Sequence, residues 1–249
     1  MLWMFDFLAQ NIYLFYGIVL LTSVLSASFG VGSFILIPLA AMVYGSKEAV
    51  GIITLYFLFQ NINKIIVFQK HIVWNVSFKM ILWSIPGAIL GSFALGFLPA
   101  DLFNKVLAIF ILAYIANDVF EFVPKKHYST HKIPLFGMLY GFLSGLVGSG
   151  NLVKGPLFTS MGLLKESYIG TYAITSFFVN VPKILVYLFI GVIVGSTFLK
   201  AIPFLVVSVV GTWIGKHLLS RISDHIFYYI VNIVFAISAV ALLFGKSIG

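Results

Sequence analysis

The chain alternates long apolar stretches with short polar connections. A helix that spans the hydrocarbon core of a membrane needs about 20 mostly apolar residues. Eight stretches reach that length, at residues 12–44, 48–68, 76–97, 103–122, 134–162, 167–190, 197–219 and 225–245. The pattern predicts an all-α polytopic membrane protein, because a lipid-exposed sheet edge would leave its backbone groups without hydrogen-bond partners.

The first and fifth stretches are longer than one crossing requires. At about 1.5 Å per residue, residues 12–44 would form a helix of roughly 50 Å, and tilting absorbs only part of the excess. Glycine tolerates an unwound backbone and proline removes a backbone donor, so residues of these two types predict helix breaks. The expected break positions are Gly30, Gly32, Pro38, Gly148, Gly150 and Pro156, with Pro182 in the sixth stretch.

The two halves of the chain repeat each other. Four positions of the stretch from Ser26 to Leu39 recur 118 residues later, at Ser144, Gly148, Gly150 and Pro156. We therefore predict two homologous transmembrane repeats, with the following boundaries: residues 1–123 and 134–249, joined by a basic cytoplasmic linker at 124–133. Each repeat has a glycine-broken, re-entrant or discontinuous first segment followed by three transmembrane helices. Gly87 and Gly91 of the third segment, matched by Gly211 and Gly215, are expected to allow close helix packing.

The basic residues indicate how the repeats are oriented. The net charge is +8, yet only 9% of the residues are charged, and Lys and Arg gather at the ends of apolar stretches, as in cytoplasmic loops of membrane proteins. If each broken segment enters and leaves on one side, the second repeat is inverted, with eight basic residues inside and four outside. A parallel arrangement gives seven and five. The charge therefore favours inverted repeats, and no nucleic-acid partner is expected.

Three lysines lie inside apolar stretches, where ionisable groups are costly and usually functional. Lys64 is close enough to the end of its stretch to reach the headgroups instead. Helix breaks also expose N–H groups that attract anions, whereas the acidic residues lie at or near stretch ends. The predicted anion-binding site near the membrane midplane comprises Lys64, Lys154, Lys183, Asn61, Asn151, Asn180, Ser28, Ser33, Ser149, Gly30, Gly32, Gly148 and Gly150.

The remaining chemistry argues against catalysis. The chain has no cysteine, and its five histidines lie in or beside loops without metal-ligand spacing. No nucleophile with a nearby base is expected in the middle of the membrane. We therefore predict no enzyme activity, no metal site and no cofactor.

The order of the motifs resembles the TauE/SafE sulfite-exporter family. The glycine-rich GFLSGLVGSG, with a proline six residues after it, HIVWNVSFKMIL, PGAILGS and LPADLF carry the resemblance, and VGTWIGK and ISDHIF repeat it in the second half. The resemblance implies a multi-pass exporter of sulfite, sulfonates or related small organic anions in the cell inner membrane. Its binding site would lie where the two glycine breaks meet. Asn151 and Ser33 replace glycines of the family pattern. The resemblance therefore does not restrict the substrate to sulfite.

Two other functions fit the same residues. The first is an anion channel, which these motifs do not distinguish from a secondary transporter. The second is a non-transporting membrane assembly protein, although such a protein would not need lysines at helix breaks. The expected partners are a small anionic substrate and the lipid bilayer. A homodimer is compatible with the sequence, although no motif specifies it.

Overall fold

The computed structural model describes residues 12–30, 33–99 and 130–223, with Leu102 and Ile226. The predicted stretch 103–122 therefore lies outside the described residues, and the stretch 225–245 lies outside them apart from Ile226. Most of the predicted linker 124–133 is outside as well.

The described part of the chain is helical. Its elements are α2 (Ile12–Phe29), α3 (Ser33–Tyr44), α4 (Ser46–Phe68), the 3₁₀ turn η1 (Gln69–His71), α5 (Trp74–Phe97), the 3₁₀ turn η2 (Thr130–Lys132), α7 (Ile133–Val147), α8 (Asn151–Ser160), α9 (Lys165–Phe189) and α10 (Gly195–Arg221). Four helical segments among these residues are long and apolar enough to cross a membrane, at Lys47–His71, Trp74–Phe97, Lys165–Phe189 and Gly195–Arg221. They match four of the predicted stretches, and the predicted all-helical membrane fold is confirmed.

Both overlong stretches break at a glycine. Gly30 follows α2 with φ of 75°, and Gly148 follows α7 with φ of 86°. This left-handed backbone region is strained for residues that carry a Cβ atom, which explains why glycine stands at both positions. The break predicted for residues 12–44 therefore separates α2 from α3, and the break predicted for 134–162 separates α7 from α8.

The three prolines do not break helices, and that part of the prediction is wrong. Pro38 lies within α3, Pro156 within α8 and Pro182 within α9. A proline removes only one backbone donor, and membrane helices tolerate this loss because neighbouring groups satisfy the freed carbonyl. A left-handed glycine, in contrast, changes the direction of the chain.

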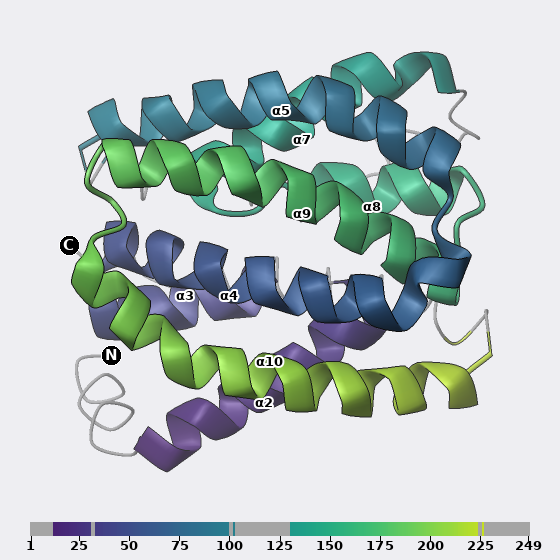
Figure 1. Cartoon of the computed structure of the whole chain (residues 1–249), viewed down its shortest axis with the longest axis horizontal. Helices are drawn as coiled ribbons and strands as arrows, with labels where there is room; N and C mark the ends of the chain where they lie inside the picture. The colour runs from purple at the N-terminus through teal and green to yellow at the C-terminus, as the bar shows by residue number, and fades with distance from the viewer. Residues whose placement is uncertain (1–11, 31–32, 100–101, 103–129, 224–225, 227–249) are drawn as a thin grey trace.

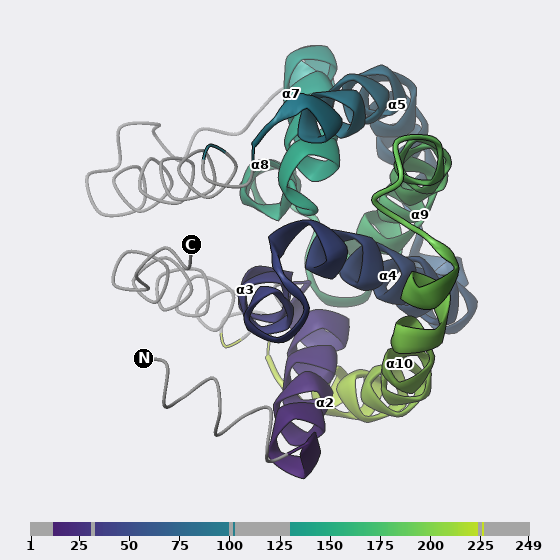
Figure 2. The same cartoon turned by 90° about the vertical axis from the view of Figure 1, so that its left-hand side faces the viewer.

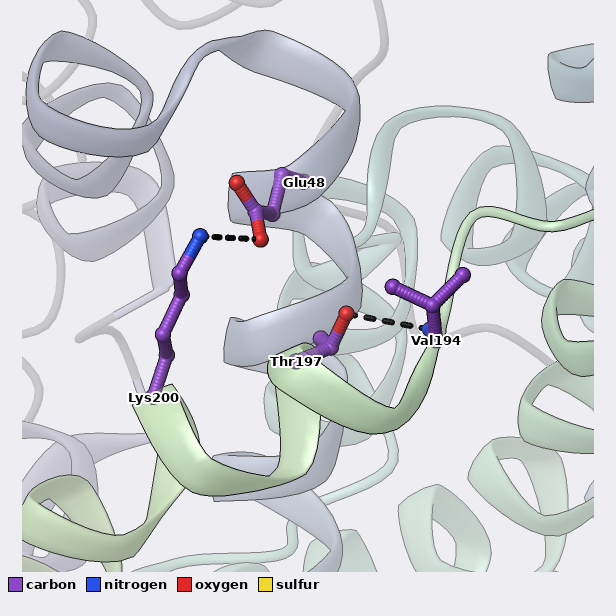
Figure 3. A network of polar contacts seen from close by, with 4 residues as sticks. All are labelled: Glu48, Val194, Thr197 and Lys200. Carbon is purple, nitrogen blue, oxygen red and sulfur yellow. Dashed lines mark hydrogen bonds and ion pairs between the residues drawn. The ribbon is translucent and has the colours of Figure 1, made fainter.

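The two broken segments open toward opposite ends of the helix bundle (Figure 1). We call these the Lys200 end, where α4 and α10 begin, and the Lys70 end, where α4 and α10 end and α9 begins. Glu48 and Lys200 form an ion pair of 2.6 Å at the Lys200 end (Figure 3). The α2–α3 hairpin starts and finishes at this end, where the rings of Phe15 and Tyr44 lie 6.4 Å apart. The α7–α8 hairpin starts and finishes at the Lys70 end (Figure 1).

Helices α4 and α9 occupy the middle of the bundle. Figure 2 shows them between an α2–α10 pair on one side and an α5–α7 pair on the other. Each outer pair therefore joins a hairpin from one half of the sequence to a long helix from the other half. The two central helices are left to face both glycine breaks.

Glycines bring the helices of each outer pair into backbone contact. A Cβ atom built on Gly91 would lie 2.0 Å from the carbonyl oxygen of Phe142 in α7, and one on Gly211 would lie 2.1 Å from Oγ of Ser23 in α2. Such distances leave no room for a side chain. The predicted packing role of these small residues is confirmed.

Replacing Gly91 by alanine should lower the midpoint of thermal unfolding, because overpacking of a tight contact costs about 1–3 kcal/mol. Gly17→Ala in α2 is the matched control, since a Cβ atom there meets nothing within 4 Å. Differential scanning fluorimetry of both detergent-purified variants provides the comparison. Equal midpoints for the two variants would contradict the close contact of α5 with α7.

Candidate functional site

A pocket with a cavity volume of about 20 Å³ lies between the two broken segments and the two central helices. Its wall is built from α2, α4, α7, the α7–α8 break, α8 and α9. The lining residues are Ser26, Phe57, Asn61, Lys64, Tyr140, Ser144, Gly148, Ser149, Asn151, Tyr172, Ser176 and Asn180. Most of these side chains carry a hydroxyl, amide or ammonium group, and none of them carries a carboxylate.

The pocket brings together about half of the residues that the sequence predicted for the site. Those lining it are Asn61, Lys64, Gly148, Ser149, Asn151 and Asn180. Two further predicted residues, Lys154 and Lys183, lie directly behind the wall, because their ammonium groups bond to lining residues. The structure therefore places all three buried lysines around one pocket.

The other predicted residues have different positions. Ser28 faces away from the pocket, since its hydroxyl donates to the carbonyl oxygens of Val24 and Gly215 at 2.9 and 3.1 Å. Gly150 packs against α7, where a Cβ atom would lie 2.3 Å from the carbonyl oxygen of Tyr140. Gly30 is buried beside the pocket wall and accepts a bond of 3.4 Å from the Asn151 amide. Gly32 lies outside the described residues, as does the side chain of Ser33.

Lys64 extends from α4 to the C-terminal end of α2. The residue is 1% exposed, and its ammonium group donates to the carbonyl oxygen and the hydroxyl of Ser26, at 2.8 and 3.0 Å. The last carbonyl groups of a helix form its negative pole, so a cation is stabilised there. The first glycine break thus provides the partner that a buried lysine requires.

Lys183 makes the corresponding contact in the second half of the chain. It extends from α9 and donates to Oγ of Ser144 and to the carbonyl oxygen of Gly148, both at 3.2 Å, and to Oδ1 of Asn180 at 3.3 Å. Ser144 is the counterpart of Ser26 in the sequence repeat. The two lysines therefore neutralise equivalent helix C-termini, on opposite hairpins.

Lys154 lies in a cage of hydroxyl groups and aromatic rings. From α8 its ammonium group donates to Oη of Tyr140 at 2.9 Å, to the carbonyl oxygen of Tyr172 at 3.2 Å, to Oγ1 of Thr175 at 3.3 Å and to Oγ of Ser176. It also lies 3.5 Å from the ring centroid of Tyr172 and 4.3 Å from that of Tyr140, a cation–π geometry.

The cage belongs to the second half only. The position 118 residues before Lys154 is Leu36, which belongs to a hydrophobic cluster. The pocket is therefore asymmetric. Lys154 adds a cation on the α8 side that the α2–α3 hairpin does not match.

The hydroxyl group of Tyr172 is buried and has no hydrogen-bond partner among the described residues. Leaving such a group unsatisfied costs about 1–3 kcal/mol. Its side chain lines the pocket, so an acceptor atom placed there would remove this cost. A small anion is an acceptor of this kind.

Sequence reasoning missed six lining residues, namely Ser26, Phe57, Tyr140, Ser144, Tyr172 and Ser176. One signal could have found part of them. Tyr172, Ser176, Asn180 and Lys183 are spaced by four, four and three residues, so they share one face of α9. Aromatic residues in membrane helices are commonly lipid contacts or interfacial anchors, so a tyrosine alone does not indicate a binding site.

The geometry defines an electropositive site. One ammonium group lines the pocket and two more lie behind its wall, and residues with hydroxyl and amide groups make up most of the lining. At an effective dielectric constant of 20, two unit charges about 6 Å apart still interact by roughly 3 kcal/mol, so a cation behind the wall also attracts an anion. The arrangement is suited to binding rather than to chemical conversion.

Replacing Lys154 by methionine should increase amide hydrogen exchange in α8. The substitution removes the bonds that tie this helix of 10 residues to α7 and α9. Hydrogen–deuterium exchange with mass spectrometry measures the effect, and Lys79→Met, at an exposed lysine of α5, is the control. If α8 exchanged equally slowly in both variants, the cage would not be what holds α8 in place.

Comparison with known proteins identifies one family. The model of the family described as sulfite exporter TauE/SafE matches residues 15–242. No curated protein and no solved structure matches the chain.

Proposed function

The chain belongs to the sulfite exporter TauE/SafE family, and we propose that it is a secondary transporter that exports sulfite, a sulfonate or a related small organic anion through the pocket between its glycine breaks. Family membership makes it a multi-pass transporter of the cell membrane and not an enzyme. The observation that carries the proposal is the pocket itself, which has hydroxyl, amide and ammonium groups and lacks a carboxylate among its lining residues.

The proposed binding mode gives each group one role. Lys64 supplies a positive charge at the pocket wall, and Lys154 and Lys183 add charge from behind it. Tyr172 supplies a hydroxyl donor that has no competing partner among the described side chains and backbone groups. The N-terminal end of α8, which begins at Asn151, faces the same pocket with its positive pole.

Asn151 connects the two breaks in this binding mode. It replaces a glycine of the family pattern, lines the pocket, and its amide lies 3.4 Å from the carbonyl oxygen of Gly30. A side chain at this position narrows the space between the hairpins. We propose that Asn151 favours a substrate whose oxygen atoms accept a hydrogen bond from its amide group. Sulfonates and carboxylates meet this requirement as well as sulfite.

The transport mechanism rests on inverted repeats, with the boundaries 1–123 and 134–249 around the linker 124–133. The opposite openings of the two hairpins support this arrangement (Figure 1). So does the charge. Among the described residues, helix termini at the Lys70 end carry Lys70, Lys79, Lys132, Lys165, Lys216 and Arg221, whereas those at the Lys200 end carry Lys47 and Lys200. The Lys70 end is then cytoplasmic by the positive-inside rule.

Rearrangement of one hairpin at a time would expose the pocket to one side of the membrane and then to the other. The homodimer stays a prediction from the sequence.

Replacing Tyr172 by phenylalanine tests the binding mode without disturbing the fold. The hydroxyl bonds to no described protein group, so the midpoint of thermal unfolding should not fall. A hydrogen bond to a charged group contributes about 1.5–3 kcal/mol, so the affinity for sulfite should fall about 10-fold or more. Isothermal titration calorimetry on the purified protein measures it, with sulfoacetate and acetate as further ligands.

Tyr56→Phe is the matched control. Tyr56 is also buried, and its hydroxyl group has no hydrogen-bond partner in the part of the chain that the structure describes, yet it does not line the pocket. Its variant should bind sulfite as the unmodified protein does. Equal affinities for the Tyr172 and Tyr56 variants would place the anion elsewhere, and an absence of binding by the unmodified protein would contradict the proposed substrate class.

A further inference from the structure

A second and larger cavity opens at the Lys70 end of the bundle. It has a cavity volume of about 450 Å³ and lies between the last turn of α4, the start of α9 and the end of α10. Its lining residues are Ile66, Val67, Phe68, Gln69, Lys70, His71, Glu166, Lys216 and Ser220. None of them lines the pocket between the glycine breaks, so this cavity is a separate site.

We propose that this cavity binds an acidic phospholipid, with the lipid phosphate between Lys70 and Lys216. The two lysines come from different elements, η1 and α10, and both side chains are exposed. Phosphate is recognised by lysine as a compact point charge, and basic pockets between membrane helices are suited to lipid headgroups.

The lining changes from apolar to polar along the chain, as a lipid requires. Ile66 on the last turn of α4 is 62% exposed and provides a surface for an acyl chain. The next residues, from Gln69 to His71, form the 3₁₀ turn and carry polar side chains. A soluble anion would have no use for the apolar half of this cavity, whereas a phospholipid contacts both halves.

Two tryptophans indicate that the cavity lies at the depth of the headgroups. Trp74 follows the 3₁₀ turn by three residues and is 60% exposed, and Trp213 lies three residues before Lys216 in α10 and is 64% exposed. Exposed tryptophan is enriched at the boundary between the hydrocarbon core and water. The lysines of the cavity are therefore positioned where lipid phosphates are found.

The wall around the phosphate position is held rigidly. The backbone N–H of Val73 donates to Oγ1 of Thr171 at 3.0 Å, which ties the segment after the 3₁₀ turn to α9. Gly170 allows α9 to approach, since a Cβ atom there would lie 2.9 Å from the carbonyl oxygen of Phe68. A cavity with a fixed wall loses little conformational entropy when it binds a ligand.

The charges select an acidic headgroup. Lys70 and Lys216 outnumber the one carboxylate of the lining, Glu166, and the exposed Arg221 follows Ser220. Glu166 should repel the negative charge of the lipid. Removing this carboxylate should therefore strengthen binding of an acidic lipid, whereas it should weaken binding of phosphatidylethanolamine, whose ammonium group would pair with it.

The experiment compares phosphatidylglycerol with phosphatidylcholine, added to the delipidated protein in detergent and measured by native mass spectrometry. The unmodified protein should retain phosphatidylglycerol in preference to phosphatidylcholine. Each lysine near the membrane surface contributes about 1 kcal/mol, or about fivefold in affinity, so Lys70→Gln with Lys216→Gln should lose about 25-fold. Glu166→Gln should bind phosphatidylglycerol more tightly.

Lys79→Gln is the matched control, because this exposed lysine lies near the same end without lining the cavity. It should retain the lipid. Inorganic phosphate should not displace phosphatidylglycerol, and the double variant should keep its affinity for sulfite, which separates this site from the proposed transport site. Equal retention of the two lipids, an equal loss in Lys79→Gln, displacement by inorganic phosphate, or loss of sulfite binding in the double variant would each overturn the proposal.

Discussion

The architecture depends on one constraint, which is that a helix broken inside a bilayer must find partners for its free backbone groups without water. Here the partners are side chains. Lys64 contacts the C-terminal end of α2 through Ser26, Lys183 contacts the break after α7 through Gly148, and the amide of Asn151 faces the carbonyl of Gly30. The negative poles of two helices and two buried ammonium groups thereby satisfy each other. Neither the breaks nor the buried lysines would be stable alone.

In the proposed function the lysines have two tasks. They hold the breaks together while the pocket is empty, and they are proposed to attract the anion that enters it. An anion between them would compete with the helix C-termini for the same ammonium groups. The proposed binding mode would therefore couple substrate binding to loosening of the hairpins through the same contacts, which is a physical basis for alternating access. Lys154, with its cage of tyrosine, threonine and serine groups, adds this coupling to the α8 side only.

The sequence was sufficient for much of this account, because the strongest signals were physical limits on length and burial. A helix cannot span residues 12–44 in one crossing, and the chain breaks after α2 at Gly30 as that limit requires.

The burial of Lys154 and Lys183 could be predicted from their distance along the sequence to the nearest polar connection. The contacts of these lysines did not follow, because a break exposes a helix C-terminus as well as an N-terminus, and only the fold decides which one a cation reaches. The sequence predicted Ser28 for the site and did not predict Tyr172, for the same reason. The rotation of α2 and α9 about their axes depends on tertiary packing, and it turns Ser28 toward α10 and Tyr172 toward the pocket.

The central claim is that one anion site between two hairpins is exposed alternately to the two sides of the membrane. Countertransport in proteoliposomes tests it most directly, with labelled sulfite inside and unlabelled sulfite added outside. A carrier must return its site across the membrane, so external sulfite should accelerate the exit of the label. Exit of the label at a rate that external sulfite leaves unchanged would contradict the alternating site and identify a channel.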